Sequence, residues 1–393
     1  MKRLLLIQLF LFLFLFSKVS KAFDETFNTK VVVGAENLQE YLHLLKNQKV
    51  GLVVNHTSKI GHEHLVDVLL KNKVKIQTIF APEHGFRGEA SAGETINNAI
   101  DQKTGISIIS LYGKNKKPSV EQLADLDIII FDIQDVGVRF YTYISTLNYV
   151  MQACAENNKS LVILDRPNPN GHYVAGPVLD LKFQSFVGVN PIPVVYGLTI
   201  GELALMNNGE EWLGKNLKCN LKIIKCRNYT HKTRYILPEK PSPNLPNNTA
   251  IWLYPSICLF EPSQISVGRG TDLQFQVIGG PDINLGDFIF TPIDKPGAIN
   301  PVNESKECFG LNLSKIDAYN TPFTLKYLIE FYKKFKDKNS FFTNKNFFNL
   351  LIGNDWVIKD VEAGNNEIDI AKKWQSDLEI FKKKRLNYLL YED

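Results

Sequence analysis

The sequence of 393 residues has few cysteines and no surplus of charge in its body. Its five cysteines include no C-x-x-C pair, which excludes a disulfide framework and a zinc site. We interpret them as buried small apolar residues, with at most one bridge such as Cys219–Cys226. The chain has 45 Lys and Arg against 41 Asp and Glu, and four of the cations lie in the first 22 residues, which contain no acid. The balanced remainder has no basic block to attract a phosphate backbone, so nucleic-acid binding is not expected.

Several cofactor and nucleophile motifs are also missing. No G-x-G-x-x-G follows the first predicted strand, and the chain contains no P-loop, no G-x-S-x-G and no H-E-x-x-H. His62 and His64 could chelate a metal, but at i, i+2 near a helix start they point apart, which favours a surface role. We therefore expect no cofactor and no metal, and a metal-dependent hydrolase ranks last among the functions considered.

The N-terminus has the pattern of a targeting segment. Lys2 and Arg3 precede a 13-residue run over residues 4–16 that is rich in Leu and Phe and interrupted only by Gln8, and Ser20-Lys21-Ala22 offers small residues at a cleavage site. The run is short for a membrane span, which needs about 20 apolar residues. The sequence predicts a signal peptide over residues 1–22 and export to the periplasm or outside, with no stable membrane insertion after cleavage. The alternative is an uncleaved anchor.

From residue 49 onward, short apolar runs alternate with helical patterns. Strands are predicted over residues 50–55, 75–80, 106–111, 127–131 and 161–164, and helices over 62–72, 119–126, 143–157 and from 199 onward. Two helix starts carry capping boxes, Ser119 with Gln122 and Thr199 with Glu202. This alternation predicts an α/β fold in which a parallel sheet is covered on both faces.

A proline cluster over residues 238–246 cannot continue a helix or a central strand, and we place a domain boundary there. Beyond it the alternation stops. A strand is predicted over residues 273–278, and helices over 325–336 and 368–389. The predicted domains are the signal peptide (1–22), a Rossmann-like catalytic domain (28–246) and a smaller α+β C-terminal domain (247–393).

Ligands of parallel sheets bind beyond the carboxyl ends of the strands, and the loops there are rich in functional groups. Residues 81–94 (APEHGFRGEASAGE), after the second strand, contain Glu83, His84, Arg87 and Glu89 within a few positions. Such a gathering of acids suits glycoside hydrolysis, which uses two carboxyl groups around one bond. The alternative is a solvated surface loop whose acids have no joint role.

Three further loops carry polar groups. Residues 132–143 (DIQDVGVRFYTY) bring together planar polar side chains and aromatic rings, as sugar sites do, although Asp135 and Arg139 at i, i+4 could instead form a structural clip. Residues 165–171 (DRPNPNG) form an irregular loop or a plain turn. In residues 266–271 (SVGRGT), Arg269 lies between two glycines that allow close backbone approach.

Together these four ordered motifs resemble the exo-β-N-acetylmuramidases of peptidoglycan turnover, a glycoside hydrolase family formerly of unknown function. The chain's end, with Trp374, Phe381 and residues 385–391 (RLNYLLY), is similar to that family's ending. The resemblance covers essentially the whole mature chain. It implies a Rossmann-like domain, a smaller C-terminal domain, a cleft between them, and removal of N-acetylmuramic acid from the non-reducing end of peptidoglycan fragments. One departure is visible, since Pro262-Ser263 follow Glu261 where the family commonly has Gly-Thr.

Carried over to this chain, the resemblance suggests roles for individual residues. Glu83 is the expected general acid, and Glu89 or Asp135 the second group, with His84 and Tyr143 orienting. The lactyl carboxylate of muramic acid needs a cation, for which Arg139, Arg166 and Arg269 are candidates. The remaining expected substrate contacts are Arg87, Tyr141 and Asn168.

A second function class stays open at this stage. A periplasmic sugar-binding or muropeptide-binding protein without hydrolytic activity would also have an export signal, two domains and a cleft. The acids of residues 83–94 favour the hydrolase, because binding alone does not require them.

Overall fold

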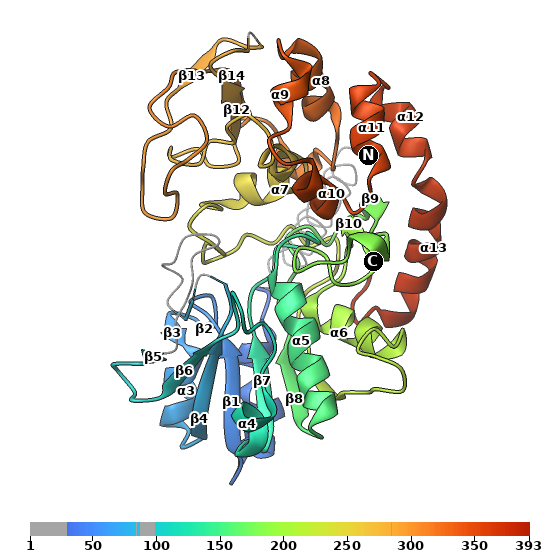
Figure 1. The fold of residues 1–393 in the computed structure, drawn as a ribbon. Helices are drawn as coiled ribbons and strands as arrows, with labels where there is room; N and C mark the ends of the chain where they lie inside the picture. Colours follow the sequence, from blue (N-terminus) through green and yellow to red (C-terminus); the bar gives the residue numbers. More distant parts are fainter. Residues whose placement is uncertain (1–29, 84, 87–98, 284) are drawn as a thin grey trace, which may run out of the picture.

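The computed structural model describes residues 30–83, 85–86, 99–283 and 285–393. The predicted signal peptide therefore lies outside the described residues. Figure 1 shows two stacked halves, one built on a sheet flanked by helices and the other mainly helical with a small sheet of its own. Within the described ranges, no helix is long and apolar enough to cross a membrane.

The first half is built on a seven-stranded sheet. Its strands are β1 (Lys49–Val54), β4 (Lys75–Ala81), β5 (Ala99–Ile100), β6 (Ser107–Ser110), β7 (Ile128–Asp132), β8 (Ser160–Leu164) and β11 (Asn220–Ile224). They lie in the order β11-β8-β7-β1-β4-β6-β5, and all neighbours are parallel except the edge strand β5. For the six parallel strands this is the order of a Rossmann fold, which confirms the predicted fold class. The order reverses between β1 and β7, so these two strands flank the switch point.

Alternating side chains of the strands divide the interior into two cores, as the period of two requires. On one face, Val53, Ile129 and Phe131 pack in one cluster with residues of α4 (Val120–Ala124), α5 (Tyr143–Glu156) and α6 (Ile200–Gly209). On the other face, Leu52 and Ile130 pack in a second cluster with residues of α2 (Leu38–Tyr41) and α3 (Leu65–Lys71). The sheet is therefore covered on both faces, as predicted.

Most predicted elements of this half are present within a few residues. Both capping boxes form, with the Ser119 hydroxyl accepting from the Gln122 backbone and the Thr199 hydroxyl accepting from that of Glu202. The helix expected over 62–72 begins only at Leu65, because the preceding residues form the small hairpin β2 (Lys59–Ile60) and β3 (Glu63–His64). His64 is buried and its ring contacts the Asn55 carbonyl oxygen, so its predicted surface role was wrong.

Six strands of this half were not predicted. They are the outermost parallel strand β11, the short edge strand β5, the hairpin of β2 and β3, and the antiparallel pair of β9 (Ala175–Val178) and β10 (Pro193–Val195). All five cysteines are buried, unbridged thiols, in line with the interpretation as small apolar residues.

The second half contains helices and one small sheet. Its helices are α7 (Asn248–Ile257), α8 (Lys326–Lys334), α9 (Lys338–Phe341), α10 (Lys345–Ile352), α11 (Trp356–Glu362), α12 (Glu367–Lys372) and α13 (Gln375–Arg385). The antiparallel sheet has the order β12-β14-β13, with β12 (Val277–Gly280), β14 (Cys308–Asn312) and β13 (Phe288–Phe290). This content is α+β, as expected.

Two predictions in the second half need correction. The expected strand over 273–278 begins only at Val277, because Phe275 has a left-handed backbone (φ 55°) that turns the chain. The expected helix over 368–389 is divided into α12 and α13 at Lys373 and Trp374.

The end of the chain packs back on the first half. Helix α13 contacts β9 (Figure 1), and the Arg385 Nε donates to the Gly197 carbonyl oxygen at 2.7 Å. The Tyr391 hydroxyl donates to Asp165 Oδ2 at 2.6 Å. The C-terminal segment thereby ties the two halves together.

Candidate active site

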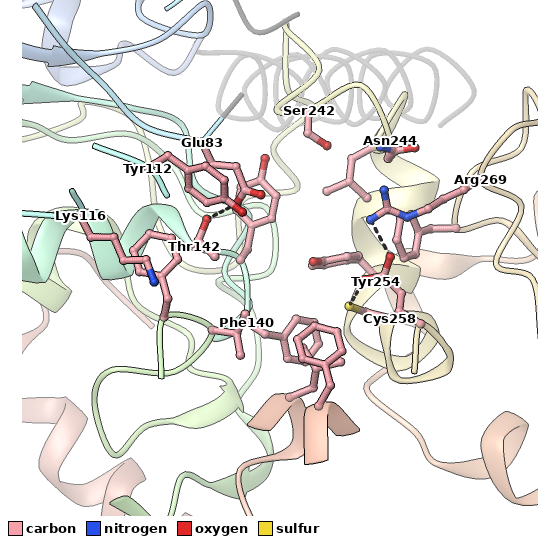
Figure 2. Close-up of a pocket in the computed structure, with 18 of the residues that line it drawn as sticks. Glu83, Tyr112, Lys116, Phe140, Thr142, Ser242, Asn244, Tyr254, Cys258 and Arg269 are labelled. Atoms are coloured by element: carbon pink, nitrogen blue, oxygen red, sulfur yellow. Dashed lines mark hydrogen bonds and ion pairs between the residues drawn. The ribbon is translucent and has the colours of Figure 1, made fainter. Parts of the chain in front are cut away.

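A pocket of about 600 Å³ lies between the two halves. One wall comes from the loops that follow β4, β6 and β7, which end at the same edge of the sheet. The facing wall comes from α7 and the segments on either side of it. Figure 2 shows the two sets of side chains, with Glu83, Tyr112, Lys116 and Thr142 on one side and Asn244, Tyr254, Cys258 and Arg269 on the other.

Glu83 lies in this pocket, as the sequence predicted for the acid-rich loop. It follows β4 by two residues, and its Oε2 accepts a hydrogen bond of 2.6 Å from the Thr142 hydroxyl (Figure 2). Thr142 is the N-cap residue of the 14-residue helix α5, so a rigid element holds the donor in place. The contact fixes the orientation of one carboxyl group at the pocket surface.

Two tyrosines support the same wall. The hydroxyls of Tyr141 and Tyr143 both donate to the Pro241 carbonyl oxygen, at 2.8 and 3.1 Å, and the rings meet edge to face at 4.8 Å. Burial raises the pKa of both phenols, so they remain neutral hydrogen-bond donors. Tyr141 lines the pocket, whereas Tyr143 is fully buried and does not line it.

The facing wall carries an ion pair between Arg269 Nη2 and Glu261 Oε1 at 2.6 Å. The guanidinium also lies over the Phe275 ring, 5.4 Å from its centre. Burial alone would lower the pKa of Arg269, but the Glu261 carboxylate outweighs it and the pKa is raised. The flanking Gly268 has a left-handed backbone (φ 79°), and a Cβ there would lie 2.6 Å from a carbonyl oxygen, so this turn requires glycine.

Asp135, expected as a possible second catalytic group, does not line the pocket. It is buried, and its Oδ2 accepts hydrogen bonds from the Gly137 amide at 2.6 Å and from the Tyr196 hydroxyl. Burial raises the pKa of its carboxyl to about 7, against the opposing effect of these two donors. This carboxyl group therefore lies behind the pocket wall.

Arg139, expected to bind substrate, is fully buried and bonded to the protein itself. Its guanidinium donates to the carbonyl oxygens of Pro177 and Ile192, both at 2.8 Å, and of Leu351 at 2.9 Å. Burial lowers its pKa to about 9, still above neutral pH, so the group stays charged. It makes no ion pair with Asp135 or with any other described residue, so the suggested i, i+4 clip does not form. Arg139 instead joins the first half to the end of α10.

Arg166 and Asn168 are likewise buried and do not line the pocket. Arg166 forms a bidentate ion pair with Asp132, with Nε and Nη2 at 2.5 and 2.9 Å from the two carboxylate oxygens. The Asn168 amide donates to the Leu198 carbonyl oxygen at 2.8 Å. Both side chains connect loops of the protein, and neither is positioned to contact a ligand in the pocket.

Three other predicted site residues, His84, Arg87 and Glu89, lie outside the described residues. Their expected roles stay predictions.

The structure adds pocket residues that sequence reasoning did not propose. Besides Thr142 and Glu261, these are Tyr112, Lys116, Phe186, Asn244 and Tyr254. Position relative to the strands could have found two of them, because Tyr112 and Lys116 closely follow the third parallel strand, β6, at the carboxyl edge of the sheet. Phe186 and Tyr254 carry no comparable local pattern.

The pocket thus offers two carboxyl groups on facing walls, one held by a hydroxyl and one by a guanidinium, among several aromatic rings. Aromatic faces and planar polar groups are suited to sugar rings and hydroxyls, and carboxyl groups perform glycoside hydrolysis. The fold and the site define the protein as a glycoside hydrolase on a Rossmann-like scaffold.

Comparison with known proteins identifies the family. Residues 50–249 match the N-terminal domain, and residues 252–391 the C-terminal domain, of the exo-β-N-acetylmuramidase NamZ family, and the chain belongs to this family. It is 36% identical over 387 residues, 92% of either chain, to the peptidoglycan β-N-acetylmuramidase NamZ of Bacillus subtilis (strain 168).

Two solved structures are similar, both of DUF1343 family proteins from Bacteroides fragilis. One is 48% identical with a TM-score of 0.86, and the other is 28% identical with a TM-score of 0.81. Each comparison covers 93% of this chain and 100% of the other. The likeness therefore extends over both halves.

Proposed function

We propose that this enzyme is an exo-acting β-N-acetylmuramidase that releases N-acetylmuramic acid from the non-reducing end of peptidoglycan fragments. The proposal is supported by membership of the exo-β-N-acetylmuramidase family and by the relative from Bacillus subtilis, which is named a peptidoglycan β-N-acetylmuramidase. The observation in this chain that carries it is the oriented Glu83 carboxyl in the pocket between the halves.

Glu83 is the proposed general acid. As the bond between C1 of the sugar and the glycosidic oxygen breaks, Glu83 gives its proton to that oxygen, and positive charge develops on the sugar ring. Thr142 keeps the carboxyl in one orientation, which is a positioning role. Water then supplies a hydroxyl to C1 and returns a proton to the site.

The second group of the reaction comes from one of two places. Glu261 is the other described carboxyl group of the pocket and lies on the facing wall, whereas Glu89 belongs to the acid-rich loop. Asp135 is not proposed for this role, because it lies behind the wall.

We propose that the enzyme works outside the cytoplasm, on peptidoglycan-derived saccharides that end in N-acetylmuramic acid. The basic, apolar and small-residue sequence of positions 1–22 supports export and cleavage. Determining the first residue of the secreted protein tests this, and a mature chain that begins near Phe23 is expected.

The test of the activity is release of the chromophore from a chromogenic β-N-acetylmuramide by the mature chain. A β-N-acetylglucosaminide serves as the substrate control, and Glu83→Gln is compared with Glu307→Gln, an exposed glutamate that does not line the pocket. We expect release from the muramide, no release by the Glu83 variant, and unchanged release by the Glu307 variant.

A folded protein that binds the muramide and releases no product would overturn the proposal and support a binding protein. Full activity in the Glu83 variant would refute the role of Glu83 and leave the activity itself standing.

A further inference from the structure

Among the described residues, none of the three arginines expected to bind the substrate's lactyl carboxylate is freely available in the pocket. Arg139 and Arg166 are buried and bonded within the protein, as shown above. Arg269 lines the pocket, but Glu261 already neutralises its charge at 2.6 Å. A cation that is paired with a carboxylate offers less attraction to a second one.

Lys116 is a pocket cation of a different kind. Its Nζ lies 4.6 Å from the centre of the Phe186 ring, and it forms no ion pair with a carboxylate of the described chain. Phe186 is itself held in place by two rings. Its ring centre lies 6.2 Å from that of Tyr149, on which it stacks, and 5.9 Å from that of Tyr112. The ring supports the ammonium by a cation–π contact and leaves its hydrogen-bond donors available.

Strand register puts Lys116 on the same wall as Glu83. In the parallel pair β4 and β6, Ala81 is opposite Ser110, so the loops that carry Glu83 and Lys116 leave the sheet side by side. Figure 2 shows both side chains on one side of the pocket and Arg269 on the other. This suits muramic acid, in which the scissile bond at C1 and the lactyl ether at C3 belong to one ring.

We propose that Lys116 binds the lactyl carboxylate and makes the enzyme select a muramide over a glucosaminide, which lacks that group. The proposal rests on the proposed function. Lysine suits this role, because its ammonium acts as a point charge on a flexible stem and can follow a carboxylate that is itself on a rotatable ether.

The test is the KM of Lys116→Met for two chromogenic muramides, one with the free lactyl carboxylate and one with the lactyl methyl amide, which has a similar shape without charge. For the charged substrate we expect KM to rise by roughly 10- to 100-fold, the effect of losing a hydrogen bond between charged groups. We expect kcat to change little, because the contact is made equally in the ground state and the transition state. The KM of the neutral amide should stay as in the wild type.

Two further variants serve as controls. Lys116→Arg keeps the charge and should retain most of the affinity. Lys117→Met removes the neighbouring lysine, which pairs with Glu156 and does not line the pocket, and it should behave as the wild type.

An unchanged KM in Lys116→Met, or an equal rise for the charged and the neutral substrate, would overturn the proposal. If the wild type hydrolyses neither muramide, the proposed function fails. Calorimetric titration with N-acetylmuramic acid and its lactyl methyl amide then still tests Lys116, since only the acid should bind more weakly to the variant.

Discussion

Two sets of polar residues lie at the carboxyl edge of the sheet, one at and after the ends of β7 and β8 and the other after β4, β6 and β7, and they have different surroundings. The inner layer consists of Asp132, Asp135, Arg139, Arg166 and Asn168. The pocket layer consists of Glu83, Tyr112, Lys116, Tyr141 and Thr142. Every member of the inner layer is buried and bonded to other parts of the protein, whereas the pocket layer lines the cavity. A polar residue in a loop beyond a strand can therefore serve the wall of a site rather than its ligand, and the two layers should respond differently to substitution.

The largest expected effect is on the buried ion pair of the inner layer. Asp132→Ala leaves the Arg166 guanidinium buried with only the Lys59 carbonyl oxygen as a partner. We expect the free energy of unfolding to fall by about 3–5 kcal/mol, as when one partner of a buried pair is removed. Urea unfolding followed by tryptophan fluorescence measures it.

The double variant Asp132→Ala/Arg166→Met is the control, because it removes both charges and should recover part of the loss. A drop of less than about 1 kcal/mol in the single variant would be typical of an exposed pair and would break the distinction between the layers.

The next effect concerns Arg139. Arg139→Met takes the donor away from three buried carbonyl oxygens, so we expect a loss of about 2–4 kcal/mol in the free energy of unfolding. The KM for a muramide, measured at a temperature where the variant is folded, should stay unchanged. A variant with unchanged stability and a raised KM would contradict the structural role of Arg139 and show that it binds substrate.

A third effect should appear in the pH dependence of stability. The folded Asp135 carboxyl keeps its proton up to about pH 7, whereas an unfolded aspartate loses it near pH 4. The stabilisation is therefore fully present below about pH 4 and is lost as pH rises towards 7. Asp135→Asn removes this dependence.

We expect the wild-type free energy of unfolding, relative to that of Asp135→Asn, to fall across this window by at most about 1.4 kcal/mol per pH unit. Asp165, whose pKa burial raises to about 6, is present in both proteins and cancels in the difference. A flat difference would show that Asp135 is ionised throughout.

The smallest expected effect lies in the pocket layer. Thr142→Val removes the hydrogen bond to Glu83 and should lower kcat by about 10-fold, the equivalent of roughly 1.4 kcal/mol. KM and the free energy of unfolding should change little, and Thr142→Ser should restore the rate. A large loss of stability without rescue by serine would place Thr142 in the inner layer.

The sequence predicted the sheet well, because its signals are local. Short apolar runs and the boxes at Ser119 and Thr199 depend on neighbours within a few positions, and the structure has both. Strand β11 was missed because only the last of its five residues, NLKII, is fully buried and the others are exposed or half-buried, so it has no apolar run like those of the central strands. The left-handed backbone of Phe275 shortens the strand predicted over 273–278. The prediction missed it because no neighbouring residue indicates a left-handed turn.

The site was predicted in part. The order of the motifs led to Glu83, Tyr141 and Arg269, all of which line the pocket. The same reasoning counted Arg139 and Asp135 as site residues and overlooked Lys116 and Glu261. The presence of a charged residue in a predicted loop does not show whether its side chain is buried or faces the pocket.

The sequence by itself determined the order along the chain of the five predicted sheet strands and the helices between them, the capped helix starts and the family, since each depends on neighbouring residues or on motifs along the chain. The tertiary structure alone decided which of the charged residues face the cavity. Burial depends on segments far apart in the sequence: the Leu351 carbonyl oxygen that binds Arg139 is 212 positions away, and the Pro241 oxygen that fixes Tyr141 is 100 positions away. Because the cost of burying a charge or a hydroxyl is met largely by such distant partners, the role of a polar residue is settled only when the chain has folded.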